Sequence, residues 1–311
     1  MSTIQTENSN QHISVVITTY NRPDKLLRCL QAIQAQTHPP LETLIVHDGS
    51  SADYTVSKAL VTKDPNMIWV EQANQGVSAA RNNGVELATG TFIAFCDDDD
   101  YWLPHHIEHL QGMITKARSV PGIYHTQRRE IRGAEWTDPE IHMKPSDLTW
   151  QEHYITKGEM IMCCTCMHKE VWEFSPFPEG VKYAEDHEQR LIALSRFPCF
   201  PSKERTVVID RTDETATNRS IYEIAAIYRD RFDTMFAIPS IAQHIRRQYR
   251  YKARFRWTSL EVSEARSQGA APFILQWFKS IPQVQSWSNM KTMILQVFWF
   301  LTQHLQQSKS P

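Results

Sequence analysis

Four consecutive aspartates, Asp97 to Asp100, have the clearest chemical potential in this chain of 311 residues. They follow Phe92 to Cys96, an apolar run without alternation that predicts a strand buried on both faces. Adjacent carboxylates repel one another, so a folded chain keeps four of them only with a counter-charge or good solvation. At the end of a buried strand they indicate oxygen ligands for a hard divalent cation. An acidic turn capping the next helix, with Pro104 in its first turn, is the plainer alternative.

The spacing within the acidic run predicts different roles for its members. Asp97 and Asp99 point to the same side if the backbone stays extended beyond the strand. We therefore expect these two to face the cation and Asp98 to face away or toward a nucleotide. Asp100 is better placed to cap the helix after Pro104, since capping needs one carboxylate.

Strands and helices alternate at short intervals in the first hundred residues. Buried strands are expected at His12–Tyr20, Leu41–Val46, Met67–Val70 and Phe92–Cys96, with helical patterns between them. This alternation predicts an α/β fold with a parallel sheet, in which ligands bind beyond the carboxyl ends of the strands. Thr18, Asp48 and the aspartates all lie at such ends, so we expect them to converge.

Four segments in register resemble glycosyltransferase family 2. They are Val16–Arg22, Ile45–Ser50, Asn74–Asn82 and Phe95–Trp102. The resemblance covers the first third of the chain and implies the GT-A fold, a Rossmann-like and mostly parallel sheet flanked by helices. It also implies an inverting enzyme that moves a sugar from a nucleoside diphosphate donor, here expected to be a UDP-sugar, to a hydroxyl of a glycan or lipid-linked acceptor.

The resemblance implies a role for each motif residue. The nucleotide-sugar site would contain Thr18, Tyr20, Arg22, Asp48, Arg81, Asp97 and Asp98. Tyr20 would lie against the base, and Asp48 would accept a hydrogen bond from a ring N–H of the base. Asp97 and Asp99 match the outer positions of the Asp-x-Asp motif, with Asp99 as the main ligand of Mg²⁺ or Mn²⁺. A cation there would neutralise the leaving diphosphate. Taken singly, each residue also has an ordinary structural explanation.

A second acidic pair, Glu185-Asp186, precedes a predicted helix, where the helix dipole stabilises carboxylates and a capping role is the structural alternative. With Arg190 it resembles the family's second motif, which implies that Asp186 is the catalytic base beside Glu185. Arg190 would orient the pair or approach the diphosphate, and His187 is an alternative base. The family often completes its metal site with a histidine after the last strand, where Asp213 is the nearest substitute.

The cysteines indicate a reducing compartment rather than a disulfide scaffold. Cys163 and Cys166 have the spacing of a zinc site, but no second pair is evident. Buried thiols in a strand spanning Met160–Met167 are the better explanation. The formal charge of −2 and the lack of a recognised module argue against nucleic-acid binding. A nucleotidyltransferase, or a sugar-nucleotide-binding protein without transfer activity, are the alternative functions.

The chain is expected to comprise a disordered tail (1–11), a catalytic domain (12–218) and a helical C-terminal extension (219–311). The catalytic domain would divide into a nucleotide-sugar-binding half (12–103) and an acceptor-binding half (104–218), with irregular acceptor-facing loops at 135–156. No secretory signal or membrane-spanning run is apparent, which predicts a cytoplasmic protein. The basic stretch 243–257 predicts either a solvated helix or a peripheral contact with the cytoplasmic face of the membrane. Contact with another subunit is a further possibility for the C-terminal helices.

Overall fold

The computed structural model describes residues 12–157, 160–181 and 184–212. The chain divides into two compact units, Met1–Glu214 and Thr215–Pro311, and all the described residues belong to the first. The predictions for the tail, for the C-terminal extension with its basic stretch, and for Asp213 therefore lie outside the described residues. The described residues include no helix that is long and apolar enough to cross a membrane.

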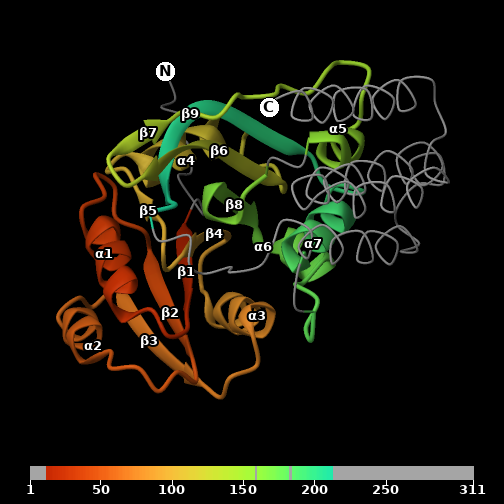
Figure 1. Cartoon of the computed structure of the whole chain (residues 1–311). Coiled ribbons are helices and arrows are strands. Elements are labelled where there is room, and N and C mark those ends of the chain that lie inside the picture. The colour runs from red at the N-terminus through yellow and green to blue at the C-terminus, as the bar shows by residue number, and fades with distance from the viewer. Residues whose placement is uncertain (1–11, 158–159, 182–183, 213–311) are drawn as a thin grey trace, which may run out of the picture. The chain divides into compact units, whose positions relative to one another are not determined.

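The first half of the sheet is a parallel block with the order β3-β2-β1-β4 (Figure 1). Its strands are β1 (Ile13–Thr19), β2 (Glu42–Asp48), β3 (Met67–Gln72) and β4 (Phe92–Asp97). The helices α1 (Pro23–Gln34), α2 (Thr55–Thr62) and α3 (Val77–Leu87) connect them. Alternate residues of β1 face opposite sides: Val15 and Ile17 join the core with α1, and Val16 lies against Gly84 of α3. Burial on both faces explains the unbroken apolar runs.

The second half makes the sheet mixed rather than wholly parallel. Its strands are β5 (Tyr101–Trp102), β6 (Ile123–Arg132), β7 (Glu135–Thr137), β8 (Thr165–His168) and β9 (Cys199–Asp210). The order continues β4-β8-β6-β9-β5, with β7 paired to β6. β8 runs antiparallel to both β4 and β6, whereas β6 and β9 are parallel. The predicted α/β class is thus confirmed, with an antiparallel strand at the join between the two halves.

The helices of the second half are α4 (His106–Lys116), α5 (Trp150–Lys157), α6 (Lys169–Phe174) and α7 (Glu185–Ala193). The stretch 135–156 is therefore not irregular throughout, because it contains β7 and most of α5. At the start of α5 the Glu152 carboxylate accepts from the Thr149 main-chain N–H over 2.7 Å, and Thr149 Oγ1 accepts from the Glu152 main-chain N–H over 3.2 Å, which is a capping box. The expected strand Met160–Met167 is instead the 3₁₀ turn η1 (Met162–Cys164) followed by β8.

Candidate active site

The carboxyl ends of the parallel strands converge as expected. Thr18 of β1 is in register with Val46 of β2 and with Asp97 of β4. A cavity of about 400 Å³ opens at these ends. Its lining includes Thr18, Arg22, Arg81 and all four aspartates, together with Val77, Ile161, Ile209, Asp210 and Arg211. A larger hollow, about 840 Å³, lies beside α4 and β9, but its lining holds none of the predicted site residues.

The acidic run turns instead of continuing as a strand. β4 ends at Asp97, and the main-chain N–H of Asp100 donates to the Asp97 carbonyl over 3.1 Å. The extended backbone that would point Asp97 and Asp99 to the same side is therefore not present after Asp97. The expected capping role of Asp100 is wrong as well: α4 begins at His106 without a side-chain cap, and Asp100 is buried. Asp100 instead accepts from the main-chain N–H of Asp210 over 3.3 Å.

Asp98 lies beneath the turn, with 2% of its surface exposed. Its carboxylate accepts a hydrogen bond from Thr19 Oγ1 over 2.7 Å and lies 3.2 Å from the Arg22 guanidinium. Tyr54 supports both partners, since its hydroxyl bonds Thr19 Oγ1 and accepts from the Arg22 main-chain N–H, each over 3.0 Å. Burial raises the pKa of Asp98 to about 7, although Arg22 and Thr19 oppose that rise. This network anchors the aspartate turn to β1.

Asp99 is held by two arginine residues. Its carboxylate pairs with Arg22, and its carbonyl accepts from the Arg28 guanidinium over 2.8 Å. Arg28 also pairs with Asp210 at the end of β9, 182 residues away in the sequence. Arg22 therefore supplies counter-charge to the acidic run, and Arg28 supplies it to Asp210.

Asp97 is joined to the second acidic motif through Arg81 of α3. The Arg81 guanidinium donates to Asp97 and to Glu185, each over 2.9 Å. Arg81 itself is only 6% exposed. Burial opposes its charge, but the carboxylates of Asp97, Glu185 and Asp186 together raise the pKa of Arg81. The structure thus brings together three predicted site residues from α3, β4 and α7.

Asp186 lies in the first turn of α7, which begins after Ala184 in the left-handed region, at φ 58°. One carboxylate oxygen accepts from the His187 main-chain N–H over 2.8 Å, and the other is 3.8 Å from Arg190. Burial alone would raise the pKa of Asp186, but electrostatic interactions with His187, Arg190 and Arg81 hold it below its usual range. Arg190 is fully buried and also donates to Thr165 Oγ1. This second contact fixes the guanidinium that lies beside Asp186.

The two residues predicted to contact the nucleotide base differ in their exposure to solvent. Asp48 at the end of β2 is buried and accepts from the side chain of Gln72 and the main-chain N–H groups of Gln75 and Gly76, over 2.8 to 2.9 Å. Tyr20, just after β1, is 44% exposed. Asp48 therefore fixes the loop that precedes α3, and Tyr20 is available at the surface.

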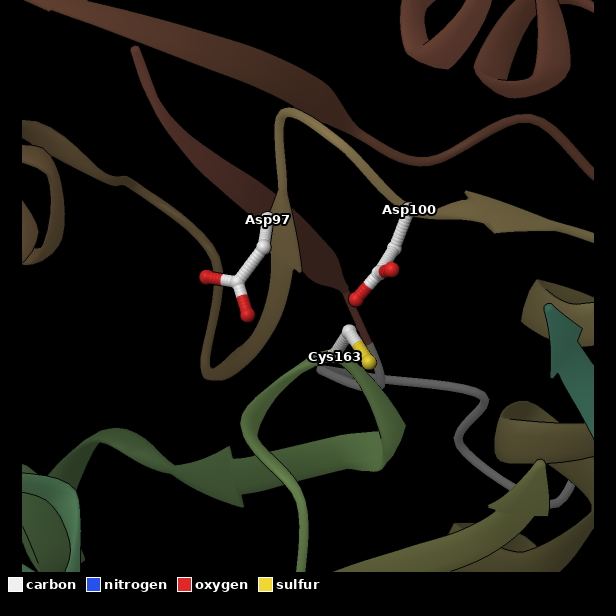
Figure 2. A group of neighbouring side chains, drawn as sticks. All are labelled: Asp97, Asp100 and Cys163. Carbon is white, nitrogen blue, oxygen red and sulfur yellow. The ribbon is translucent and has the colours of Figure 1, made fainter. Parts of the chain in front are cut away.

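Asp97, Asp100 and Cys163 bring their potential ligand atoms together. The carboxylate oxygens and the sulfur all lie within 4.8 Å of one another (Figure 2). The two carboxylates suit Mg²⁺ or Mn²⁺, which are commonly held by one or two carboxylates together with substrate phosphates. Asp99 is not in this group. The donor set therefore fits a divalent cation, although its members differ from the predicted Asp97–Asp99 pair.

Some residues around the site were not predicted from the sequence. They are Arg28, Tyr54, Asp100 as a possible ligand, Cys163 and Asp210. Asp210 follows the apolar run Thr206–Ile209, so the rule that ligand-facing residues follow strands could have found it. Arg28 has no such signal, because only the tertiary fold brings it to Asp210.

Known glycosyltransferases are similar to this chain in sequence. The family description Glycosyl transferase family 2 matches residues 14–175, more than half of the chain. The chain is 38% identical over 107 residues to the uncharacterized glycosyltransferase YibD of Escherichia coli, and 43% identical over 108 residues to the uncharacterized glycosyltransferase YwdF of Bacillus subtilis. These alignments cover 34% and 35% of this chain, and only 31% and 40% of the relatives.

Two solved structures share the fold. TarS of S. aureus (residues 1–349, in complex with UDP-GlcNAc) gives a TM-score of 0.64 at 16% identity, covering 88% of this chain and 82% of that one. The mannosyltransferase PcManGT of Pyrobaculum calidifontis, in complex with GDP-Man and Mn²⁺, gives a TM-score of 0.56 at 15% identity. That alignment covers 97% of this chain and 88% of the other. At these identities the similarity is one of fold, and it agrees with the GT-A architecture expected from the sequence.

Proposed function

This chain belongs to glycosyltransferase family 2, and on that basis we propose that it is an inverting transferase of a sugar from a nucleoside diphosphate donor. The acceptor is a hydroxyl group of a glycan or of a lipid-linked acceptor. The single observation that carries this proposal is the position of Arg81 between Asp97 and Glu185. It holds the carboxylate expected on the donor side next to the acidic pair expected on the acceptor side.

The donor is proposed to bind at the 400 Å³ cavity, where Arg22 and Arg81 offer positive charge. Thr18, Tyr20 and Asp48 would contact the nucleoside, and Asp97 and Asp98 would lie on the sugar and ribose side. TarS binds UDP-GlcNAc and PcManGT binds GDP-Man, which supports a nucleotide sugar as the ligand class. We propose a UDP-sugar as the first donor to test.

Asp97 and Asp99 are the proposed ligands of Mg²⁺ or Mn²⁺, with Asp100 close to Asp97. A bound cation would neutralise the negative charge that develops on the leaving diphosphate. Asp99 would exchange its ion pair with Arg22 for that cation. Asp213, predicted as a further ligand, keeps that role as a proposal only.

Asp186 is proposed to accept the proton of the acceptor hydroxyl as its oxygen attacks the anomeric carbon. The bond from that carbon to the diphosphate breaks on the opposite face, so the anomeric configuration inverts. The electrostatic interactions that lower the pKa of Asp186 keep it ionised at neutral pH and able to take a proton. Glu185 accepts from Arg81, which favours Asp186 over Glu185 as the base.

The domain division and cellular location are also retained as proposals. Residues 12–103 would supply the nucleotide-sugar-binding half and residues 104–218 the acceptor-binding half. A cytoplasmic location, and contact of residues 219–311 with a membrane surface or a second subunit, agree with the sequence composition.

The test uses the full chain with a panel of UDP- and GDP-sugars, with and without Mn²⁺. Thermal shift reports donor binding, and release of the nucleoside diphosphate reports transfer. Asp186→Asn should bind donor like the wild type but transfer about 100-fold more slowly or worse. Glu86→Gln, at an exposed position near the C-terminal end of α3, is the control and should leave both unchanged.

The outcomes separate the proposal from its alternatives. If the Asp186→Asn variant transferred sugar at the wild-type rate, Asp186 would not be the catalytic base. Donor binding without transfer to any acceptor would indicate a sugar-nucleotide-binding protein. If no nucleotide or nucleotide sugar stabilised the chain, the donor site would be wrongly assigned.

A further inference from the structure

The thiol of Cys163 lies against two carboxylates of the aspartate turn. Figure 2 shows the Asp97 and Asp100 side chains leaving the same turn, with the Asp100 carboxylate directed toward the Cys163 sulfur. One ligand atom from each of the three residues lies within 4.8 Å of the other two. This upper limit is close to the largest separation of two donors on one ion, about 4.6 Å, because metal–oxygen and metal–sulfur bonds are about 2.0–2.3 Å long.

Local hydrogen bonds account for this grouping. The bond from the Asp100 main-chain N–H to the Asp97 carbonyl closes the turn and places both side chains on the side of η1. Asp98 and Asp99 are engaged elsewhere, with Thr19 and Arg22. On the other side, Trp102 Nε1 donates to the Cys163 carbonyl over 2.9 Å, which holds η1 beneath the aspartates.

We propose that Cys163 is a direct ligand of the divalent cation in this site, together with Asp97 and Asp100, so that the ligand set differs from the proposed Asp97–Asp99 pair. The inference rests on the proposed function in taking the cation to be the one that assists transfer. On binding, the thiol releases its proton to solvent and the sulfur donates an electron pair to the ion, with no change of oxidation state.

A sulfur ligand changes which ions the site prefers. Mg²⁺ is a hard ion that demands near-ideal octahedral coordination by oxygen and dehydrates reluctantly. Thiolate is a soft ligand that selects softer ions, while two carboxylates still suit Mn²⁺. The site should therefore favour Mn²⁺ over Mg²⁺, and it should bind Co²⁺ and Cd²⁺ through sulfur.

The test uses the full chain under reducing conditions, without donor, and titrates Co²⁺ and Cd²⁺. Coordination by thiolate produces a sulfur-to-metal charge-transfer absorption, which is expected in the wild type. Cys163→Ser should lose this band, whereas Cys164→Ser should retain it. Cys164 is the matched control because it is the adjacent buried thiol and does not belong to the donor group.

Affinity gives a second measurement. Cys163→Ser should weaken Mn²⁺ binding, measured from the electron paramagnetic resonance of free Mn²⁺, by about tenfold or more. Its affinity for Mg²⁺, measured by competition, should change by less than about threefold. Circular dichroism establishes that the Cys163→Ser variant is folded. The charge-transfer band of the wild type tests the proposal even if that variant does not fold. Absence of the band in the wild type, or its persistence in Cys163→Ser, would overturn the proposal.

Parallel transfer assays with Mn²⁺ distinguish this inference from the proposed function. Transfer by the wild type without any charge-transfer band would overturn the sulfur ligand and leave the transferase. A band that depends on Cys163, in a chain that transfers no sugar, would support the ligand and overturn the function.

Discussion

Asp97 and Glu185 accept hydrogen bonds from one guanidinium, that of Arg81, which lies 104 residues before Glu185 in the sequence. Arg81 is nearly inaccessible, and the side chain of Asp97 is 30% exposed. Without the guanidinium, two carboxylates would face each other in a poorly solvated position. Arg81 is therefore the residue on which the two acidic motifs depend for their relative placement.

Replacing Arg81 by Gln should destabilise the fold by about 3 kcal/mol, because removing one partner leaves uncompensated buried charge. The double variant Arg81→Gln/Glu185→Gln should recover part of that loss, since one of the two stranded carboxylates is then neutral. Urea unfolding of the single and double variants measures the coupling between the two residues. Strictly additive losses would contradict the shared role. Arg81→Lys keeps the charge but not the fork, so it should retain stability better than transfer activity.

The pKa of Asp186 gives an expectation for the pH profile of transfer. A base acts while ionised, so kcat/KM falls as pH drops through its pKa. Burial raises that pKa and electrostatic interactions with His187, Arg190 and Arg81 lower it, with a net lowering. In Arg190→Gln one of these interactions is lost, so the acid limb should move upward.

The control for that profile is Arg196→Gln, an exposed arginine just beyond α7. It should leave the acid limb in place. A folded Arg190→Gln protein with an unchanged acid limb would mean that Arg190 does not tune the base. Thermal melting of both variants separates this outcome from unfolding.

The parallel half of the fold and much of the site could be predicted from the sequence. Unbroken apolar runs locate β1, β2 and β4 to within a few residues, and the strand-end rule brings Thr18 and the aspartates to one cavity. These signals are local, or follow from one general property of parallel sheets. The capping-box residues Thr149 and Glu152 are a local signal of the same kind, and their spacing could have predicted the start of α5.

The arrangement of the four carboxylates could not be predicted from local sequence signals. Whether the chain extends or turns after Asp97 depends on Thr19 and Tyr54, which anchor Asp98 from β1 and the segment before α2. The antiparallel position of β8 between β4 and β6 is also a tertiary pairing without a local signal. These long-range contacts decided that Asp97 lies with Asp100 and Cys163 rather than with Asp99.

Acid should destabilise the fold through His106 at the start of α4. Its Nδ1 lies 2.6 Å from Thr206 Oγ1, and its Nε2 has no hydrogen-bond partner among the described residues. Burial lowers the pKa of His106 well below its usual range, and His109 and His105 lower it further. Below about pH 6.5, His106 binds a proton in the unfolded chain but stays neutral in the folded chain. Stability is therefore present above that pH and falls below it by up to about 1.4 kcal/mol per pH unit.

His106→Asn tests this dependence by urea unfolding between pH 5 and pH 8. The variant should be less stable at pH 8, because a buried ring is lost, but its stability should decline less steeply toward pH 5. His38→Asn is the exposed control and should keep the wild-type slope. Equal slopes for His106→Asn and the wild type would assign the acid sensitivity to other groups.

The close approach of α3 to the sheet depends on Gly84. A Cβ atom added there would lie 2.5 Å from Val16 Cγ1 and 3.2 Å from Val46 Cγ2, inside the packed core. Gly84→Ala should therefore destabilise the fold by about 1–3 kcal/mol and push α3, which carries Arg81, away from β1. The matched control is Gly112→Ala in α4, where nothing lies within 4 Å of the added atom. That change should stabilise the chain by about 0.5–1 kcal/mol, because alanine is the better helix former. Opposite signs in thermal or urea unfolding would confirm that the glycine of α3 is required by packing, and a stabilising Gly84→Ala would refute it.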